Sequence, residues 1–261
     1  MKRIQLHAYA KINLTLDVTG KRPNGYHDVE MIMQQISLCD EVTVSWEAGS
    51  VRRGKPSQTA EPDPTGIQIQ LTVSRPDLPA DSSNLAWKAA EEMIAEFGGP
   101  AGGNANAAAG TDAADGSSKA AAGTEAAGGV LTIDIQKQIP MAAGLAGGSS
   151  NCATVLHAIN QLWELNLSVK ELCRIGARLG SDVPFCIMGQ AAAEKALQGS
   201  FADDPDACHC ALATGTGTDL KPLTGLDSFI VLSKPAIGVS TAEVYRGIDN
   251  EGIPRHPDNN A

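Results

Sequence analysis

The sequence contains no block of lysine or arginine residues and no long apolar run. Its 20 Lys and Arg residues are outnumbered by 30 Asp and Glu residues, and the formal net charge of -10 argues against a surface that binds the phosphate backbone of nucleic acid or anionic lipid. No segment approaches the roughly 20 apolar residues of a membrane-spanning helix, and residues 1–7 lack the apolar region of a secretion signal. We therefore expect a cytoplasmic protein with neither nucleic acid nor a membrane as its partner.

Two common nucleotide-binding motifs are also missing. The chain has neither Gly-x-x-x-x-Gly-Lys-Ser/Thr nor Gly-x-Gly-x-x-Gly after a strand, so the P-loop and Rossmann mechanisms lose support. The 6 cysteines are scattered, and we expect them to be reduced thiols. Cys208-His209-Cys210 has metal-ligating residue types, but no second pair follows at the spacing of a zinc site, so we expect no metal there. A small anionic substrate is still compatible with the composition, because a few local cations and backbone N–H groups suffice to bind it.

Hydrophobic periodicity divides the chain into strands and helices. Alternating or continuous apolar residues predict strands over 4–18, 41–46, 67–73, 130–135 and 229–232. Amphipathic spacing predicts helices over 85–94, 152–163 and 168–179, the last with a capping box of Ser168 and Glu171, and a further helix that starts at 240.

Two segments do not fit this pattern. Residues 98–129 are almost all Ala, Gly and small polar residues without apolar periodicity, so they cannot bury enough surface to offset the entropy of ordering them. We predict a disordered surface insertion there. Residues 190–210 are rich in Ala and Asp, and we interpret them as a second insertion or an irregular excursion of the chain.

The strongest functional signal is a loop of small residues between the strand at 130–135 and the helix at 152–163. Small residues let the backbone approach a ligand closely, and hydroxyl groups and a helix N-terminus attract phosphate oxygens. This is the outline of a nucleotide phosphate site, and the alternative is a plain flexible loop before a capped helix. The loop residues that we expect to bind ATP are Pro140, Met141, Ala142, Ala143, Gly144, Leu145, Ala146, Gly147, Gly148, Ser149 and Ser150.

The same loop carries a family resemblance. Its pattern, Pro-x-x-x-Gly-Leu-x-Gly-Gly-Ser-Ser, resembles the ATP-binding signature of the GHMP kinases. Two further blocks are similar to signatures of the diphosphocytidyl-methylerythritol kinases within that superfamily: residues 10–14 together with 25–27, and residues 180–185. The blocks follow in the family's order, and the resemblance covers residues 1–97 and 130–248.

The resemblance implies an α+β fold with two domains. Residues 1–224 would form the ribosomal protein S5 domain 2-like ATP-binding domain, and 225–261 would begin a ferredoxin-like C-terminal domain. The third glycine-rich motif of the superfamily has no counterpart after Phe229. We therefore expect an incomplete C-terminal domain, as in a truncated chain.

The implied activity is transfer of the γ-phosphate of ATP, with Mg2+ on the nucleotide phosphates, to the 2-hydroxyl of 4-diphosphocytidyl-2-C-methyl-D-erythritol, in the non-mevalonate route to isoprenoid precursors. The partner would be this small molecule, and the protein a monomer or homodimer. Two alternatives stay open: another GHMP kinase, with a homoserine or mevalonate-type substrate, and a non-catalytic remnant that binds nucleotide.

The resemblance also assigns the catalytic residues. Asp182 matches the family's catalytic aspartate and Lys11 its neighbouring lysine, which would keep Asp182 ionised and steady the reacting groups. Taken alone, Asp182 would be a turn residue after a helix. Lys11 would be a solvated strand lysine, because the alternation of its strand points it away from the core.

Four further residues are assigned to the ligands. Tyr26 and His27 resemble the family's cytidine-binding pair, and Tyr245 matches an aromatic residue that covers the cytosine from the other side. Asn84 matches an asparagine near the adenosine, although capping of the helix at 85–94 explains it nearly as well.

The loop departs from the family pattern at three alanines. Ala142, Ala143 and Ala146 stand where the family often has glycine. If the backbone there has a positive φ, each alanine adds strain of order 1 kcal/mol.

Overall fold

A computed structural model of the chain describes residues 1–49, 66–100, 128–235, 238 and 241–251. The elements, in chain order, are β1 (Lys2–Lys21), β2 (His27–Ala48), β3 (Ile67–Val73), α1 (Leu85–Phe97), β4 (Gly129–Gln136), α2 (Gly147–Leu162), α3 (Val169–Leu179), α4 (Val183–Ala193), α5 (Gln198–Phe201), β5 (Cys210–Thr214), β6 (Asp219–Leu223) and α6 (Thr241–Glu251).

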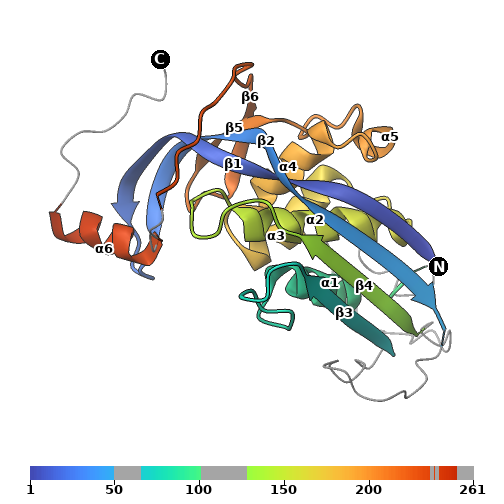
Figure 1. Cartoon of the computed structure of the whole chain (residues 1–261). Coiled ribbons are helices and arrows are strands. Elements are labelled where there is room, and N and C mark those ends of the chain that lie inside the picture. Colours follow the sequence, from blue (N-terminus) through green and yellow to red (C-terminus); the bar gives the residue numbers. More distant parts are fainter. Residues whose placement is uncertain (50–65, 101–127, 236–237, 239–240, 252–261) are drawn as a thin grey trace, which may run out of the picture.

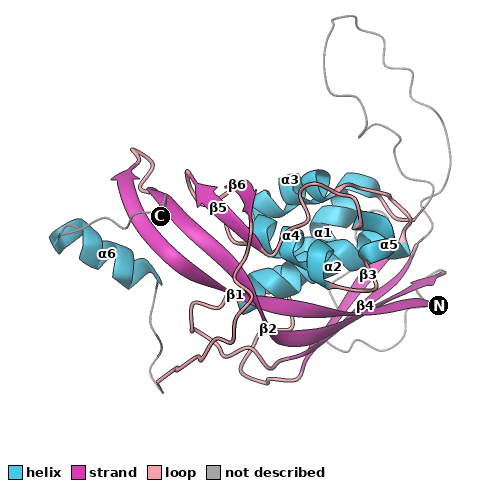
Figure 2. Ribbon diagram, turned by 90° about the horizontal axis from the view of Figure 1, so that it is seen from above, coloured by secondary structure: helices cyan, strands magenta, loops and turns pink. Residues whose placement is uncertain are grey.

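A 6-stranded sheet forms one layer of the molecule, and helices α1 to α4 lie together on one side of it (Figures 1 and 2). The strand order is β3-β4-β2-β5-β6, with β1 paired to β2 in a long antiparallel hairpin. Among the strands of the described residues, only β3 and β4 run parallel. The two halves of β2 have different neighbours: Met31–Gln34 pairs with β5, and Glu41–Ala48 pairs with β4.

The main core lies between this sheet and the helices. The alternating residues Leu131, Ile133 and Ile135 of β4 are buried, as the sequence predicts, and they pack with the apolar faces of α1 and α2. Trp46 of β2 meets Trp163 edge to face, with ring centroids 5.7 Å apart. Each large apolar side chain buried in this way contributes about 1.5–3 kcal/mol. The strands and helices that carry the candidate site therefore rest on one packed core.

Most local predictions are confirmed. The predicted strands at 4–18 and 41–46 are parts of the longer strands β1 and β2, and the capping box of Ser168 and Glu171 starts α3. Most of the predicted insertion, residues 101–127, lies outside the described residues. In the segment 190–210, α4 continues to Ala193, and Leu197 and Phe201 are buried in the main core. This segment is therefore a packed part of the fold.

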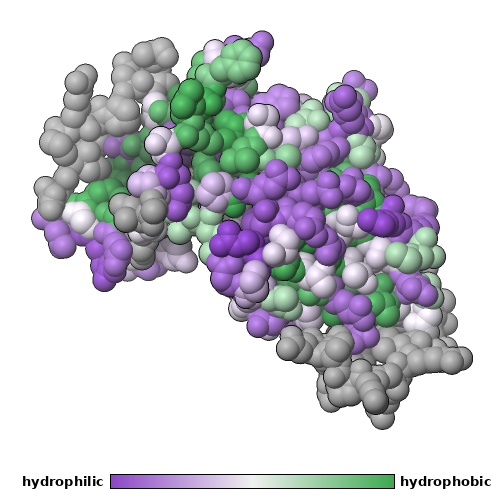
Figure 3. Space-filling view, viewed as in Figure 1, coloured by the Kyte–Doolittle hydropathy of each residue, from purple (hydrophilic) through white to green (hydrophobic). Residues whose placement is uncertain are grey.

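The strand predicted at 229–232 is wrong. Phe229 and Val231 have exposed fractions of 107% and 95%, and the segment forms no strand. A strand needs a neighbour that pairs with its backbone, and none of the described strands pairs with this segment. Figure 3 shows hydrophobic surface gathered where the chain continues beyond β6. Apolar sequence alone was not enough to make a strand.

Helix α6 lies against the far end of the β1–β2 hairpin (Figure 1). Tyr245 and Ile248 pack against the small apolar cluster formed around Val29 and Met31, and Asp249 forms an ion pair with Lys21. None of the helices in the described ranges is both long and apolar enough to cross a membrane.

Candidate active site

The glycine-rich loop joins β4 to α2 and contains several left-handed residues. Ala142, Gly144 and Ala146 have φ values of 48°, 72° and 55°. The expected strain at alanine is therefore present at Ala142 and Ala146, at about 1 kcal/mol each, and Ala143 is not among the residues with positive φ. Such a conformation persists only when its surroundings hold it in place.

The first turn of α2 is suited to an anion. The residue at its N-cap is Ala146, whose side chain has no acceptor for the N–H groups of the first turn, and the first turn contains no acidic residue. Helix geometry leaves these N–H groups without intrahelical partners, and they concentrate partial positive charge. Gly148 is exposed and Ser149 half-buried, so this turn can present N–H groups and a hydroxyl to a phosphate.

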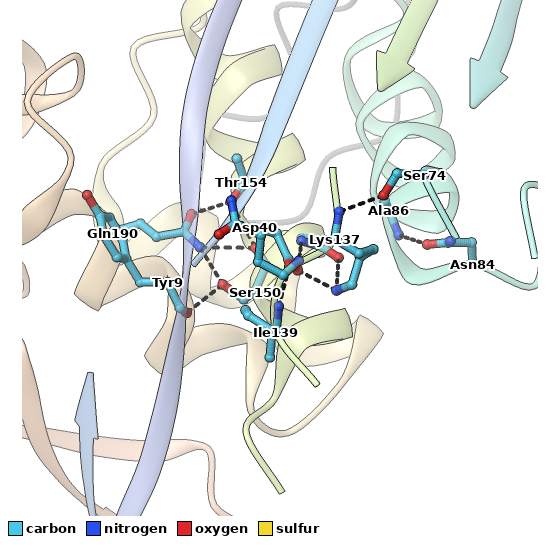
Figure 4. A network of polar contacts seen from close by, with 12 residues as sticks. Tyr9, Asp40, Ser74, Asn84, Ala86, Lys137, Ile139, Ser150, Thr154 and Gln190 are labelled. Atoms are coloured by element: carbon cyan, nitrogen blue, oxygen red, sulfur yellow. Dashed lines mark hydrogen bonds and ion pairs between the residues drawn. The ribbon is translucent and has the colours of Figure 1, made fainter. Parts of the chain in front are cut away.

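Ser150 is different, because its side chain points into the protein (Figure 4). Its hydroxyl donates to the carbonyl oxygen of Tyr9 at 2.6 Å and accepts from Gln190 at 3.1 Å. The hydroxyl of Thr154 completes the group: it lies 2.9 Å from both the Ser150 carbonyl oxygen and Gln190 Oε1, two acceptors that share its one proton. The predicted contact of Ser150 with ATP therefore stays a prediction, and its side chain ties α2 to β1 in this structure.

Lys11 and Asp182 form an ion pair beside the loop, with Lys11 Nζ 3.4 Å from Asp182 Oδ1. Lys11 is only 5% exposed, and its Nζ also donates to Asn13 Oδ1 at 3.0 Å. Its backbone N–H donates to the carbonyl oxygen of Leu145, which joins the strand of Lys11 directly to the glycine-rich loop. A buried ammonium group needs such polar partners to offset its lost hydration.

The prediction that Lys11 points away from the core is wrong. The pairing register of β1 and β2 shifts between Tyr9, which lies opposite Cys39, and Lys11, which lies opposite Gln35. The irregularity breaks the alternation, so that Ala10 and Lys11 are both buried. Lys11 is not a solvated strand lysine.

Asp182 is the N-cap residue of α4, and its side chain makes no capping hydrogen bond. Its side chain is 31% exposed, so one face of the carboxylate is open to a substrate. The positive end of the α4 dipole and the Lys11 ammonium both lie beside this carboxylate. The carboxylate is thus held by two positive groups and still accessible.

Of the three aromatic residues assigned to the cytidine, the structure brings two into contact. His27 stacks on Tyr245 with ring centroids 4.7 Å apart, and its Nε2 lies 2.8 Å from Asp249 Oδ1. Burial and the negative charge of Asp182 raise the pKa of the Tyr245 phenol, so this pair lies within the electrostatic reach of the ion pair. Tyr26 is 66% exposed in the turn between β1 and β2. The rings of His27 and Tyr245 already stack on each other. A cytosine base could therefore stack only on the outer face of one of these rings.

Asn84 lies at the start of α1, where both ends of its amide are used. Its Oδ1 accepts from the N–H of Ala86 at 2.9 Å, and its Nδ2 donates to the carbonyl oxygen of Pro79 at 2.8 Å. Capping therefore accounts for this residue in the structure, and a contact with adenosine stays a prediction.

Sequence reasoning missed Asn13 as a site residue. It lies in the same motif block as Lys11, two positions further along, and its amide oxygen helps to hold the ammonium group. The irregular strand makes this contact, and the alternation of the sequence does not reveal it.

Comparison with known proteins places the chain in a known family and gives the same fold. The family described as GHMP kinases N terminal domain matches residues 84–190. The 4-diphosphocytidyl-2-C-methyl-D-erythritol kinase of Alkaliphilus metalliredigens is 38% identical over 258 residues, which are 98% of this chain and 67% of that protein. A crystal structure of 4-(cytidine 5'-diphospho)-2C-methyl-D-erythritol kinase has a TM-score of 0.56 at 25% identity, over 94% of this chain and 64% of that one.

A homoserine kinase from Cytophaga hutchinsonii shares the fold, with a TM-score of 0.50 at 14% identity, over 94% of this chain and 60% of that one. The sheet, the loop and these matches define the class as the GHMP kinases. Within that class, the chain belongs to the 4-diphosphocytidyl-2-C-methyl-D-erythritol kinase family. It spans about two thirds of the length of these relatives.

Proposed function

We propose that this chain transfers the γ-phosphate of ATP to the 2-hydroxyl of 4-diphosphocytidyl-2-C-methyl-D-erythritol. The observation that carries the proposal is the ion pair of buried Lys11 with partly exposed Asp182, which is joined to the glycine-rich loop through the contact of Lys11 with Leu145. A carboxylate, a cation and a phosphate-binding helix terminus are the groups that phosphoryl transfer to an alcohol requires. The family of the chain supports the choice of substrate.

Each group has a distinct task in this proposal. The N–H groups at the start of α2 bind the nucleotide phosphates, and Asp182 accepts the proton of the attacking hydroxyl or orients it. Lys11 keeps Asp182 in place and stabilises negative charge on the phosphoryl group as it moves. Because both are fixed before the substrate arrives, little reorganisation is needed during the reaction.

Mg2+ would neutralise phosphate charge when it is bound. Among the described residues there is no group of three or more His, Cys, Asp or Glu side chains that could hold a metal ion. We therefore propose that the nucleotide phosphates carry the ion, and that the hydroxyl of Ser149 and the carboxylate of Asp182 would supply the oxygens of the protein. This fits an ion that enters the site as MgATP.

We propose that the cytidine end of the substrate binds near the hairpin turn. Tyr26 offers an exposed ring for stacking, and Asp249 holds His27 against Tyr245. Because the ring of Tyr26 is largely exposed, it is accessible to a ligand that stacks on it. A cytoplasmic location and a monomeric or dimeric state stay part of this proposal.

ADP release by the purified chain tests the proposed function. With MgATP, release should depend on 4-diphosphocytidyl-2-C-methyl-D-erythritol, and phosphorus NMR should show a new phosphomonoester on the product. Homoserine and mevalonate serve as matched acceptors, and preferential turnover of either would replace the proposed substrate with another of the superfamily. Binding of ATP without turnover of any acceptor would favour a non-catalytic nucleotide-binding protein.

A further inference from the structure

A buried carboxylate lies between residues at the two ends of the glycine-rich loop (Figure 4). Asp40, in β2, is 0% exposed. Its Oδ1 accepts from the backbone N–H groups of Gln138 and Ile139, at 2.7 and 2.8 Å. Its Oδ2 accepts from Asn151 Nδ2 at 2.9 Å and pairs with Lys137 Nζ. One carboxylate thus has four protein partners, and the mechanism proposed above uses none of them.

These partners lie at the two ends of the loop. Lys137, Gln138 and Ile139 precede it, whereas Asn151 lies in the first turns of α2 and accepts a further hydrogen bond from Lys137 at 2.9 Å. The ends approach closely, because a Cβ atom at Gly147 would lie 3.2 Å from Lys137 Nζ and 3.1 Å from the side chain of Ile139. Asp40 therefore fixes the distance between the end of β4 and the start of α2.

The loop between these ends needs such support. It contains two alanines in the left-handed region, Ala142 and Ala146, and strained conformations of this kind persist only when the surroundings determine them. A site built from backbone N–H groups has no side chains that could adjust, so its affinity depends on how well the backbone is held.

We propose that Asp40 is a positioning residue that holds the nucleotide-binding loop in its binding conformation, through Lys137 and Asn151. The inference rests on the proposed function in one respect, namely that the loop binds the phosphates of ATP. Asp40 acts through the loop, so its loss weakens the binding of nucleotide and leaves the binding of the phosphoryl acceptor unchanged.

Two variants test the role of the charge. Asp40→Asn keeps the shape and can still accept from Gln138 and Ile139, but its amide group would face two donors, Lys137 Nζ and Asn151 Nδ2. The double variant Asp40→Asn/Asn151→Asp moves the negative charge from residue 40 to residue 151. The new carboxylate at 151 then pairs with Lys137 and accepts a hydrogen bond from the amide at residue 40. In both variants the binding of a non-hydrolysable ATP analogue with Mg2+ is measured by calorimetry.

We expect Asp40→Asn to weaken analogue binding about tenfold or more, since charge-assisted contacts that order the loop are lost. The double variant should recover affinity to within about threefold of the wild type. Asn151→Ala removes only the tie to α2, and it should weaken binding by about threefold even if Asp40→Asn does not fold. In the active enzyme, the KM for ATP should rise and the KM for the acceptor should not.

Asn160→Ala is the matched control for a merely structural effect. Asn160 lies near the other end of α2, where its amide bonds the backbone N–H and carbonyl oxygen of Leu167 at 3.0 and 3.1 Å. This variant should lower Tm and leave the affinity for the analogue unchanged. An affinity loss in Asn160→Ala as large as that in Asp40→Asn, or a double variant that recovers nothing, would overturn the proposal.

The measurement separates this inference from the proposed function. Analogue binding needs no turnover, so a chain that binds the analogue and phosphorylates nothing would end the proposed function while the variants still decide the role of Asp40. A wild-type chain that does not bind the analogue would overturn both.

Discussion

Mild acid should destabilise this protein through one buried histidine. His157 lies within α2 and is 0% exposed, its Nε2 bonds the carbonyl oxygen of Ile187 at 3.0 Å, and its ring packs edgewise against Phe201. A carbonyl oxygen only accepts, so the proton of the neutral ring is on Nε2. Burial lowers the pKa of His157 from 6.5 to about 4, because the charged imidazolium would lose its hydration.

The size of the effect follows from the two pKa values. As the pH falls below 6.5 the unfolded chain takes up a proton at His157, whereas the folded protein does so only near pH 4. The contribution of neutral His157 to the free energy of unfolding is therefore fully present above pH 6.5 and is lost as the pH falls toward 4. Between pH 8 and pH 5 this linkage costs about 2 kcal/mol of unfolding free energy.

Urea unfolding at about pH 8 and pH 5, followed by circular dichroism, measures this loss. His157→Met removes the titrating group at similar volume but forfeits the bond to Ile187, which should cost about 1–3 kcal/mol at both pH values. Its free energy of unfolding should fall about 2 kcal/mol less than that of the wild type between the two pH values. His209→Gln, at an exposed histidine, should keep the wild-type dependence. Equal pH dependence in the wild type and His157→Met would refute the reasoning.

Three further outcomes are expected. Lys11→Met should lower kcat for ADP release by about 100-fold or more while calorimetry shows retained ATP binding, because the variant loses the positive charge that Lys11 holds beside Asp182 and the migrating phosphoryl group. Ala146→Gly should relieve left-handed strain and raise the free energy of unfolding by up to about 1 kcal/mol, whereas Ala143→Gly, the matched control, should lower it or leave it unchanged in thermal unfolding. Tyr245→Ala should raise the KM for the cytidine-containing substrate, and Tyr245→Phe, which keeps the ring, should restore it in steady-state assays.

Local signals in the sequence predict a large part of this fold. The capping box at Ser168, the cap at Asn84 and the alternation of β4 depend on neighbouring residues, so a short stretch of sequence contains the information. The glycine-rich loop is also local. The sequence shows that an alanine in this loop would be strained if its φ were positive. The structure was needed to show that φ is positive at Ala142 and Ala146.

The parts that could not be predicted depend on distant residues. Lys11 is buried because the register of a long hairpin shifts beside it, and a regular alternation gives no sign of that shift. Asp40 and Lys137 are 97 residues apart in sequence and meet only because β2 pairs with β4. The apolar run at 229–232 failed as a strand for the converse reason, since pairing requires a neighbour that a single segment does not specify.

The most direct test of the account concerns the carboxylate of Asp182. ADP release with MgATP and 4-diphosphocytidyl-2-C-methyl-D-erythritol should be compared between the wild type, Asp182→Asn and Asp77→Asn, the last at an exposed aspartate that pairs with Arg75. The account predicts substrate-dependent turnover that falls by about 100-fold or more in Asp182→Asn, with ATP binding retained and Asp77→Asn unaffected. Turnover in Asp182→Asn at the level of the wild type would contradict it.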